Sequence, residues 1–516
     1  MEANADASIR LTPVCDVWDG FGFLPVAVHV ENHATRARTW NIGFDVGAFY
    51  GGGLLSHASF SFIVPPGGTT DSVVFVPGGG SNTNNYTAQM RVSASGHGVQ
   101  SAGRIFMMQG RQKNFNHAAV SPKLEAAVRK WAPDTGNQAP FQVAVATPAD
   151  WPADWRVWTP FDRVVLTTDE FDALDAARRN SLREWVAQGG LLVLYPTRDG
   201  RGSEEHVNLG LGLVVTAKRP LGVESGPLIT RFEAGGNRLA PWIAVAPLLS
   251  DADSKVLAVS GGRGGLILFL LVFGILIGPV NLYVFAPAAK RQRLFFTVPA
   301  ISLGASLLLV GFIVLKDGFG GEGTRRSLVL LLPGENKAVV CQQQVSRTGL
   351  LLGHGMTVSA DTLLAKEVTE FRASLPTFEL TREGDHADGD WFTSRARQVQ
   401  QLRSITPTRA RIELAPAAGP DAPPVVQTSF TTVLRDFVYV DGKGAAWTAA
   451  EVPPGRRVEL VRRGKLESHP SRIERSGWFY ASGGPSELAP LATLASIRWT
   501  QDTIFYTGRV EAAFTP

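Results

Sequence analysis

A serine and a histidine stand close together in the segment RGSEEHVN, as Ser203 and His206. A serine hydroxyl beside an imidazole base is the arrangement with which many hydrolases activate a nucleophile. A Ser/His pair at this spacing is frequent by chance, and the segment has no G-x-S-x-G turn of the kind that exposes a nucleophilic serine. Ser203 and His206 are therefore weak catalytic candidates, and we expect no catalysis from this loop.

Carboxylates gather in the segment REGDHADGDW, which contains Asp385, Asp388 and Asp390. Calcium prefers several oxygen ligands, so these aspartates are weak candidates for a calcium site. The segment lacks the ligand spacing of an EF-hand loop and its closing glutamate. We expect a solvated acidic loop, and the sequence indicates no metal or cofactor.

Composition disfavours both thiol chemistry and nucleic acid binding. The chain has 2 cysteines, Cys15 and Cys341, which lie far apart in the sequence. This disfavours a disulfide framework or a thiolate metal site. The net charge is only +4 over 516 residues. A nucleic acid interface needs a strongly basic face, so we expect no nucleic acid partner.

Two uncharged apolar runs, 266–287 and 294–315, follow one another closely. A helix needs about 20 apolar residues to cross the hydrocarbon core of a bilayer. Strands and core helices of soluble domains are usually shorter. The runs predict a two-helix transmembrane hairpin over 264–316, with the lipid bilayer as its partner.

The turn of this hairpin carries Lys290, Arg291 and Arg293, which we expect at the membrane interface. The positive-inside rule would place the turn in the cytoplasm and both large flanks outside it. The opening residues MEANADASIRL contain no apolar signal-peptide core. Export of the first flank then implies a start further upstream or a signal already removed. The alternative places both flanks in the cytoplasm.

Small and polar residues in the first run indicate how the hairpin packs. Gly274 and Gly278 allow membrane helices to approach closely. Asn281 is the one amide of this run, and we expect it to hydrogen-bond to the second helix. Two helices without buried charges enclose no ion path, so we expect no transport through the hairpin itself.

The N-terminal region, 1–105, reads as an all-β domain. FLPVAVHVEN alternates apolar and polar residues as a half-buried strand does. Further short alternating segments follow, separated by Gly- and Pro-rich turns. This pattern predicts an immunoglobulin-like β-sandwich.

The next region, 106–260, has a different pattern. We expect an amphipathic helix over 174–190 that ends at Gly189. Strand, helix and strand in succession, with near-continuous apolar strands, predict a doubly wound, flavodoxin-like α/β sheet. The expected strands are 141–148, 161–171 and 191–197, and an earlier helix is expected over 121–132.

The stretch FDRVVLTTDEFDALDAARRNSLREWVAQGGLLVLYPT resembles the class I glutamine-amidotransferase-like fold. Active members of that fold carry a Cys nucleophile in the tight turn after the last strand of this pattern. The present chain has Tyr195, Pro196 and Thr197 there, and no cysteine lies between Cys15 and Cys341. The resemblance therefore implies a degenerate domain that cannot perform thiol acyl transfer.

The hairpin sequence GPVNLYVF, its basic turn and FFTVPAISL are similar to a group of bacterial inner-membrane proteins of unknown function. Those proteins have a β-sandwich, a degenerate amidotransferase-like domain, two spans and a β-rich tail in that order. Their genes often lie near those of MoxR-type AAA ATPases and von Willebrand A domain membrane proteins. The resemblance implies a role in envelope assembly or in maturation of a secreted complex.

The tail, 322–516, is expected to be β-rich, as one domain or two. RRSLVLLLPGENKAVVCQQQVS predicts a hairpin turning at 333–336, and DFVYVDGKGAAWTA predicts another at 441–442. WFTSRARQVQQLRS suggests a short surface helix over 391–404 that would expose its arginines.

These observations favour a non-catalytic, membrane-anchored scaffold or binding protein of the bacterial inner membrane. Its partners would be other envelope or membrane proteins, which the sequence does not identify. Two alternatives stay open. A hydrolase would require Ser203 and His206 to meet in a pocket. An accessory subunit of a transport or secretion complex would pack partner helices on the glycine face and Asn281, and would copurify with other spanning proteins.

Overall fold

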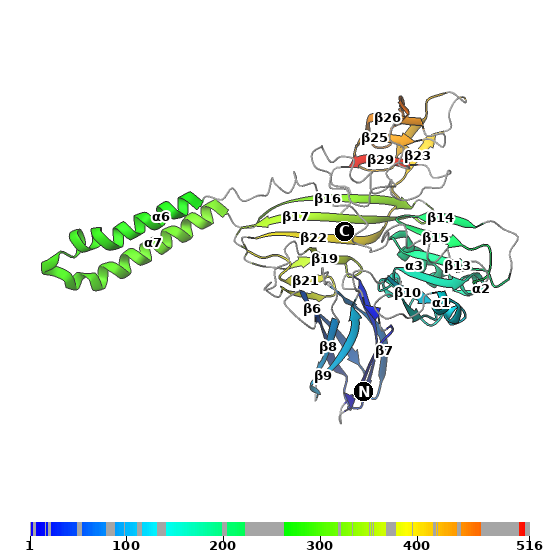
Figure 1. The fold of residues 1–516 in the computed structure, drawn as a ribbon, viewed down its shortest axis with the longest axis horizontal. Coiled ribbons are helices and arrows are strands. Elements are labelled where there is room, and N and C mark those ends of the chain that lie inside the picture. The colour runs from blue at the N-terminus through cyan, green and yellow to red at the C-terminus, as the bar shows by residue number, and fades with distance from the viewer. Residues whose placement is uncertain are drawn as a thin grey trace.

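The computed structural model describes residues 2–3, 7–15, 17–18, 22–48, 54–78, 88–96, 99–110, 116–131, 141–198, 204–221, 263–317, 321–332, 334–349, 351, 353, 355–367, 378–394, 396–415, 419, 422–440, 445–465 and 505–510. Most of these residues lie in β-strands, which form several sheets. Two apolar helices extend from the sheets as a separate arm (Figure 1).

Two sheets of the N-terminal flank, the part of the chain before the arm, pack face to face. Val26, Val28 and Val30 alternate along β4 as buried residues, and they share one core with Trp40 and Phe44 of β5. The alternation predicted for β4 is confirmed. The smaller sheet has the order β1-β2-β4-β7, with bounds Glu2–Ala3, Ala7–Pro13, Phe23–Asn32 and Thr69–Pro77.

The larger sheet continues into the C-terminal flank, the part of the chain after the arm. β6 pairs in parallel with β20, with His57 opposite Thr381. Ser59 Oγ donates to Glu383 Oε1 over 2.6 Å, although 324 residues separate the two. The order is β18-β21-β20-β6-β5-β8-β9-β3, with bounds Met356–Thr357, His386–Gly389, Phe378–Glu383, Leu54–Val64, Arg38–Ala48, Ala88–Gly96, Val99–Gly110 and Val17–Trp18.

A third sheet has mainly parallel pairing, in the order β11-β10-β12-β13-β15-β14. Only β14 pairs antiparallel within it. Helix α3 packs with one set of strand residues and α1 with the alternate set, so the two helices cover opposite faces. The bounds are Asn116–Val120 for β10, Phe141–Val145 for β11, Arg163–Thr167 for β12, Leu191–Tyr195 for β13, Glu205–Leu209 for β14, Gly212–Thr216 for β15, Glu125–Trp131 for α1 and Ala176–Ala187 for α3.

The predicted amphipathic helix is confirmed as α3. The Asp175 side chain caps its first turn by accepting from the Arg178 N–H over 2.8 Å. Gly189 follows its end with a φ of 122°, a conformation that glycine adopts without strain. The strand predicted over 161–171 is too long, because Thr167 and Glu170 form a capping box that starts helix α2 (Thr168–Ala173).

The arm is a helical hairpin. It consists of α6 (Arg263–Ile275), a π-helical segment η2 (Leu276–Phe285), a 3-10 turn η3 (Ala288–Arg293) and α7 (Leu294–Asp317). Two segments, Ile267–Phe285 and Lys290–Phe312, are long and apolar enough to cross a membrane. Almost none of these residues is buried within the molecule.

The C-terminal flank contains a long sheet in the order β16-β17-β22-β19. The hairpin predicted around 333–336 is confirmed by β16 (Gly321–Leu332) and β17 (Lys337–Thr348). The surface helix predicted over 391–404 is wrong, because β22 (Arg397–Pro407) pairs with β17 on one side and β19 (Leu363–Glu367) on the other.

Small sheets complete the C-terminal flank. One has the order β23-β24-β27, with bounds Ile412–Ala415, Val425–Thr428 and Val458–Glu459. The other has the order β28-β26-β25-β29, with bounds Val461–Lys465, Ala445–Val452, Leu434–Val440 and Phe505–Val510. Strands β25 and β26 form the second predicted antiparallel pair, and the turn predicted at 441–442 lies outside the described residues.

Candidate functional site

The structure describes only His206 of the predicted catalytic pair. His206 lies in β14, and its Nε2 is 2.6 Å from Glu204 Oε1. Ser203 lies outside the described residues. His206 therefore has a carboxylate partner at a sheet edge, and the prediction for the Ser203/His206 pair stays untested.

Hydroxyl and carboxyl groups do meet at the carboxyl edge of the parallel sheet. Thr197 Oγ1, in the turn after β13, donates to Asp169 Oδ2 over 2.8 Å. Ser121 Oγ donates to Glu170 Oε1 over 2.7 Å, and Ser121 is fully buried. Burial raises the pKa of Glu170, but hydrogen bonds from Ser121 and Thr167 outweigh this and hold the pKa below its usual value. The hydrogen-bonding groups of these side chains therefore satisfy one another.

Tyr195 takes the last position of β13, directly before the turn that contains Thr197. Its side chain is fully buried, and its hydroxyl has no hydrogen-bond partner. Burial, and secondarily the charge of Glu204, raise the pKa of this phenol, so it stays protonated. A protonated, enclosed phenol is neither a nucleophile nor a base.

The three weak metal candidates point to separate backbone partners. Asp385 Oδ1 accepts from the Ala360 N–H over 2.6 Å, and Asp390 Oδ2 accepts from the Glu379 N–H over 2.9 Å. Asp388 Oδ1 accepts from the N–H of the next residue. The described residues contain no group of three or more side chains that could hold a metal ion. The segment also forms the β20–β21 hairpin rather than the predicted loop.

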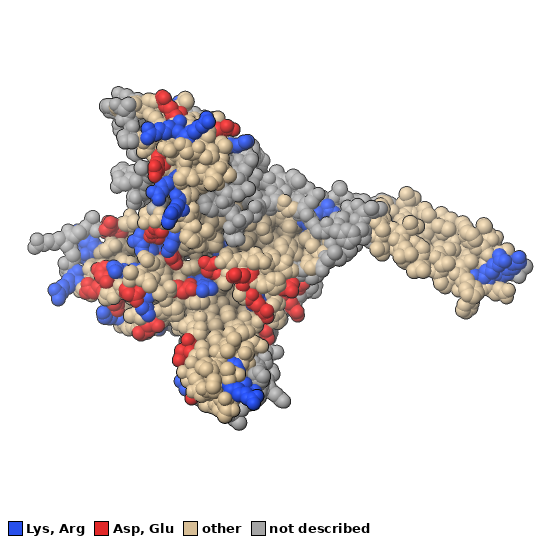
Figure 2. Space-filling view, turned by 180° about the vertical axis from the view of Figure 1, so that it is seen from behind, with Lys and Arg blue, Asp and Glu red and all other residues tan. Residues whose placement is uncertain are grey.

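The hairpin presents its apolar side chains outward. Phe295 is 86% exposed and Phe296 is 81% exposed. Lys290, Arg291 and Arg293 lie exposed in η3 at its tip, and the visible face of the arm is otherwise uncharged (Figure 2). Such a surface is unfavourable in water and suits a bilayer, with the basic tip at a headgroup layer.

The predicted packing role of the glycines is not seen within the hairpin. A Cβ added at Gly274 or Gly278 would meet no atom within 4 Å, so neither glycine contacts α7 closely. Asn281 is 0% exposed, yet neither atom of its amide has a hydrogen-bond partner. The hydrogen bond predicted from Asn281 to the second helix is therefore wrong.

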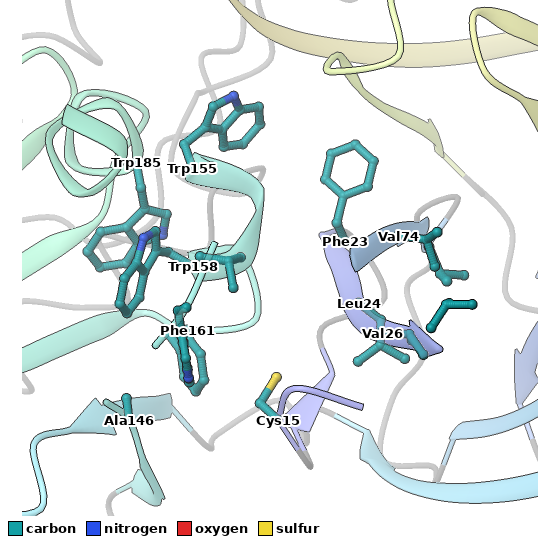
Figure 3. Packing of buried hydrophobic residues seen from close by; sticks show 14 of the residues in the cluster. Cys15, Phe23, Leu24, Val26, Val74, Ala146, Trp155, Trp158, Phe161 and Trp185 are labelled. Carbon is teal, nitrogen blue, oxygen red and sulfur yellow. The ribbon is translucent and has the colours of Figure 1, made fainter. Parts of the chain in front are cut away.

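Sequence patterns missed the place where the two flanks meet. Phe23, at the start of β4, is 1% exposed and makes an edge-to-face contact with Trp155 (Figure 3). A second edge-to-face contact joins it to Phe75. The guanidinium groups of Arg156 and Arg382 lie 5.6 Å and 6.0 Å from the centroid of the Phe23 ring. We call Phe23, Arg156, Arg382 and their contacts the flank junction.

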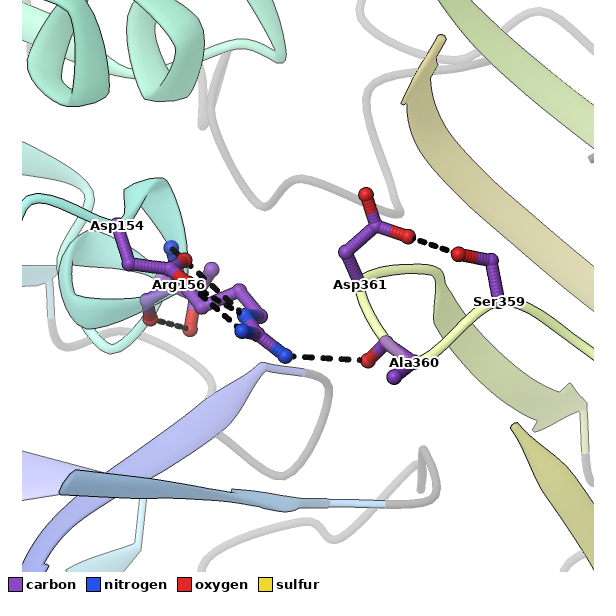
Figure 4. Close-up of polar contacts among 6 residues, drawn as sticks. Asp154, Arg156, Ser359, Ala360 and Asp361 are labelled. Atoms are coloured by element: carbon purple, nitrogen blue, oxygen red, sulfur yellow. Dashed lines mark hydrogen bonds and ion pairs between the residues drawn. The ribbon is translucent and has the colours of Figure 1, made fainter. Parts of the chain in front are cut away.

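Arg156 joins three parts of this junction. Its Nε and Nη2 both donate to the Asp154 carboxylate, with 2.7 Å between Nη2 and Oδ2. Its Nη1 donates to the Ala360 carbonyl over 3.2 Å, in a loop of the C-terminal flank (Figure 4). The guanidinium also lies 4.3 Å from the centroid of the Phe75 ring. The paired carboxylate and the aromatic faces compensate for the partial burial of this charge.

Arg382, in β20, belongs to the C-terminal flank. It is 6% exposed, and it donates to the carbonyls of Thr362 and Ser359 over 2.7 Å and 2.6 Å. Burial, and secondarily repulsion by Arg156, lower the pKa of Arg382 to about 10. The guanidinium therefore stays charged at neutral pH and ties β20 to the loop before β19.

Lys366, in β19, is another buried cation of the C-terminal flank. It is 5% exposed, and its Nζ donates to the Asp390 carbonyl. Burial lowers its pKa to about 8, and the charge of Asp390 opposes part of this shift. Burial therefore destabilises the charged form of this ammonium.

A second contact joins α3 to the long sheet of the C-terminal flank. Arg183 Nη2 is 2.7 Å from Glu335 Oε1. Glu184 pairs with Lys337, and the buried Arg403 donates to the Gln188 carbonyl at the end of α3. A cation at a helix C-terminus also interacts favourably with the helix dipole.

The signals for these contacts are weak in the sequence. Arg382 stands in the acidic segment that was predicted to be a solvated loop. Each arginine has one contact in the opposite flank, Arg156 with the Ala360 carbonyl and Arg382 with the Phe23 ring. One local feature does point to the junction. Gly22 lies so close to Thr159 that a Cβ would be 2.8 Å from Thr159 Oγ1, and that hydroxyl bonds both the N–H and the carbonyl of Phe23.

No protein-family model and no curated protein matches the sequence. An alkylpurine DNA glycosylase of Pseudomonas fluorescens aligns at 14% identity and a TM-score of 0.16, over 21% of this chain and 31% of that one. A β-glucosidase of Streptomyces venezuelae aligns at 16% identity and a TM-score of 0.14, over 20% of this chain and 15% of that one. The chain thus spans less than a third of either protein.

A β-glucuronidase of Parabacteroides merdae aligns over 88% of this chain and 74% of its own, at 7% identity and a TM-score of 0.16. TM-scores this low carry no argument about fold or activity.

Proposed function

We propose that this chain is a non-catalytic scaffold or binding protein anchored in a bacterial inner membrane. The observation that carries the proposal is the pairing of β6 with β20 on either side of an apolar hairpin. Because the two flanks share one sheet, they lie on the same side of the membrane. A hairpin that crosses twice meets this requirement. Its lipid-facing surface anchors the two flanks, which together we call the body.

The proposed orientation rests on charge. Lys290, Arg291 and Arg293 are the tip of the hairpin, and basic turns stay in the cytoplasm. The body would then lie outside the cytoplasm, in the envelope.

The proposed domain identities rest on topology and on the missing nucleophile. A parallel sheet with helices on both faces supports a flavodoxin-like, amidotransferase-like domain. Tyr195 and Thr197 stand where a Cys nucleophile would be required, so the domain would serve as a binding module. The facing sheets of the N-terminal flank support an immunoglobulin-like sandwich. The resemblance to proteins encoded near MoxR and von Willebrand A genes suggests a partnership with such a system.

Reporter fusions test the orientation. Alkaline phosphatase or a fluorescent protein is fused after Pro516, and each is inserted separately beside Arg291, with the native upstream DNA retained. We expect phosphatase activity at Pro516 and fluorescence at Arg291. The reverse pattern would place the body in the cytoplasm and would contradict the proposed envelope location. Phosphatase activity at both positions would mean that the hairpin does not cross the membrane.

A further inference from the structure

The basic tip of the arm has no counter-charge within the hairpin. Lys290, Arg291 and Arg293 are all exposed, and the tip lies at the end of the arm away from the sheets (Figure 1). The sequence contains no aspartate or glutamate from residue 263 to residue 316. The next carboxylate, Asp317, is at the far end of α7, about 35 Å away along the helix. Salt screens charges over about 8 Å, so only the surroundings of the arm can balance the charge of the tip.

Exposed aromatic side chains flank this tip in the sequence on both sides. Tyr283 precedes it at 77% exposed, and Phe295 and Phe296 follow it at 86% and 81% exposed. Tyrosine is enriched where hydrocarbon meets lipid headgroups, and exposed phenylalanine rings favour the hydrocarbon itself. These rings place the boundary of the hydrocarbon within a few residues of the basic tip. The cations therefore lie at the level of the lipid phosphates.

The chemistry of the tip distinguishes between kinds of phospholipid. Arginine binds phosphate oxygens through paired N–H donors, and lysine binds them as a point charge. In phosphatidylcholine, the ammonium of the headgroup cancels the charge of its own phosphate. In phosphatidylglycerol the phosphate keeps its negative charge. Three cations without a carboxylate partner in the hairpin are therefore better matched by anionic headgroups than by zwitterionic ones.

We propose that Lys290, Arg291 and Arg293 form a binding site for the headgroups of anionic phospholipids. In the proposed orientation these lipids belong to the cytoplasmic leaflet, whose surface is negatively charged. The site holds the tip at that surface, and the visible face of the arm is otherwise uncharged (Figure 2). This inference rests on the proposed membrane insertion and names the lipid partner of the inserted hairpin.

A fluorophore placed between the cations reports which lipids contact the tip. Gln292→Cys is labelled in the full chain, because Gln292 is exposed whereas the native Cys15 and Cys341 are buried. The labelled chain is reconstituted in phosphatidylcholine vesicles. These vesicles also contain either phosphatidylglycerol or phosphatidylcholine with a nitroxide quencher near the headgroup. Quenching by the two lipids, compared at equal content, gives the relative affinity of the tip for the two headgroups.

We expect the tip to prefer phosphatidylglycerol by about fivefold or more, since one basic residue near an anionic membrane surface is worth about that factor in affinity. High salt should reduce the preference, because it screens exposed charges. Lys290→Gln, Arg291→Gln and Arg293→Gln together should bring the preference close to one.

The matched control removes the same charge from the C-terminal flank. Arg409→Gln, Arg456→Gln and Arg457→Gln together change three exposed arginines outside the arm and should leave the preference unchanged. Equal loss in both triple variants would overturn the proposal, because the total charge of the chain would then attract the lipid. Equal quenching by the two lipids in the unaltered chain, or a preference that the tip variant keeps, would also overturn it.

Two further measurements separate this inference from its alternatives. If inorganic phosphate abolishes the preference and NaCl of the same ionic strength does not, the tip binds free phosphate and the proposal fails. Carbonate extraction tests insertion in the same vesicles. A chain that carbonate releases would contradict the proposed function together with this inference. A chain that stays inserted but shows no preference would contradict this inference alone.

Discussion

The flank junction and the hairpin treat buried polar groups in opposite ways. Arg156 and Arg382 each have oxygen acceptors and an aromatic face within the molecule. Asn281 is 0% exposed, but among the described residues neither its Nδ2 nor its Oδ1 has a hydrogen-bond partner. The junction is therefore complete when the chain folds alone, whereas the hairpin is complete only with surroundings that the isolated chain does not supply.

The largest effect is expected from deleting the hairpin, which should release the flanks from the membrane. Replacing 263–317 with a short Gly/Ser linker should move the chain from the membrane fraction to the soluble fraction almost completely. The contacts between flanks do not involve the hairpin, so the body should still fold. Carbonate extraction and sedimentation measure the outcome. Neutralising the tip with Lys290→Gln, Arg291→Gln and Arg293→Gln is the control and should leave the chain membrane-bound. A linker variant that stays in the membrane would contradict the account.

Within the junction, Phe23→Ala should have the largest effect on stability. It removes a ring that is 1% exposed and that contacts two aromatic rings of the N-terminal flank and one arginine of each flank. We expect the free energy of unfolding to fall by about 3–5 kcal/mol, as for other buried aromatic truncations. Urea unfolding in detergent measures it. Ile63→Ala, at a side chain 74% exposed, should change it by less than about 0.5 kcal/mol. Similar losses for both variants would refute the assigned role of Phe23.

Lys366 makes the stability of the C-terminal flank depend on pH. Its pKa is lowered to about 8 in the folded chain, against about 10.4 when unfolded. Between these values the unfolded chain binds more protons, so this residue makes stability rise with pH. The difference between the unaltered chain and Lys366→Met should shift by about 2–3 kcal/mol from pH 7.5 to pH 10.5. Groups common to both chains, such as the Cys341 thiol, cancel in this comparison. A difference that does not change with pH would contradict the claim that burial lowers the pKa of Lys366 in the folded chain.

The smallest effect is expected where the flanks meet at the surface. Arg183 pairs with Glu335, but the Arg183 side chain is 47% exposed. Such pairs contribute about 0.2–1 kcal/mol, and salt weakens them. Glu335→Gln should therefore lower the free energy of unfolding by no more than about 1 kcal/mol, and less in 1 M NaCl. A loss as large as that of Phe23→Ala would make this contact, rather than the junction, the main link between flanks.

Local patterns in the sequence predicted those elements whose signal lies within one segment. The uncharged runs located the hairpin, and Gly189 located the end of α3. The paired runs around 333–336 predicted the β16–β17 hairpin. In each case hydrophobic periodicity or a special backbone conformation is set by neighbouring residues, so no distant partner had to be known.

The same reasoning failed where a distant partner decides the outcome. The segment around Arg397 and Arg403 reads as a surface helix, but β17 and β19 pair with it on both sides and bury Arg403. The acidic segment around Asp385 reads as a solvated loop, yet it is the turn of a strand pair attached to β6. The structure also places Asn281 in a π-helical turn, which a regular helical pattern does not predict.

The central claim is that both flanks form one body on one side of the membrane. An engineered disulfide between Ser59→Cys and Glu383→Cys tests it, with a site for a specific protease inserted at the hairpin tip beside Arg291. These positions are adjacent across the β6–β20 pairing. After oxidation and cleavage in membranes, the account predicts that the two halves stay linked until a reductant is added. Ile63→Cys with Glu383→Cys, out of register, should not link them. Halves that separate without reductant in the Ser59 and Glu383 variant would contradict the claim.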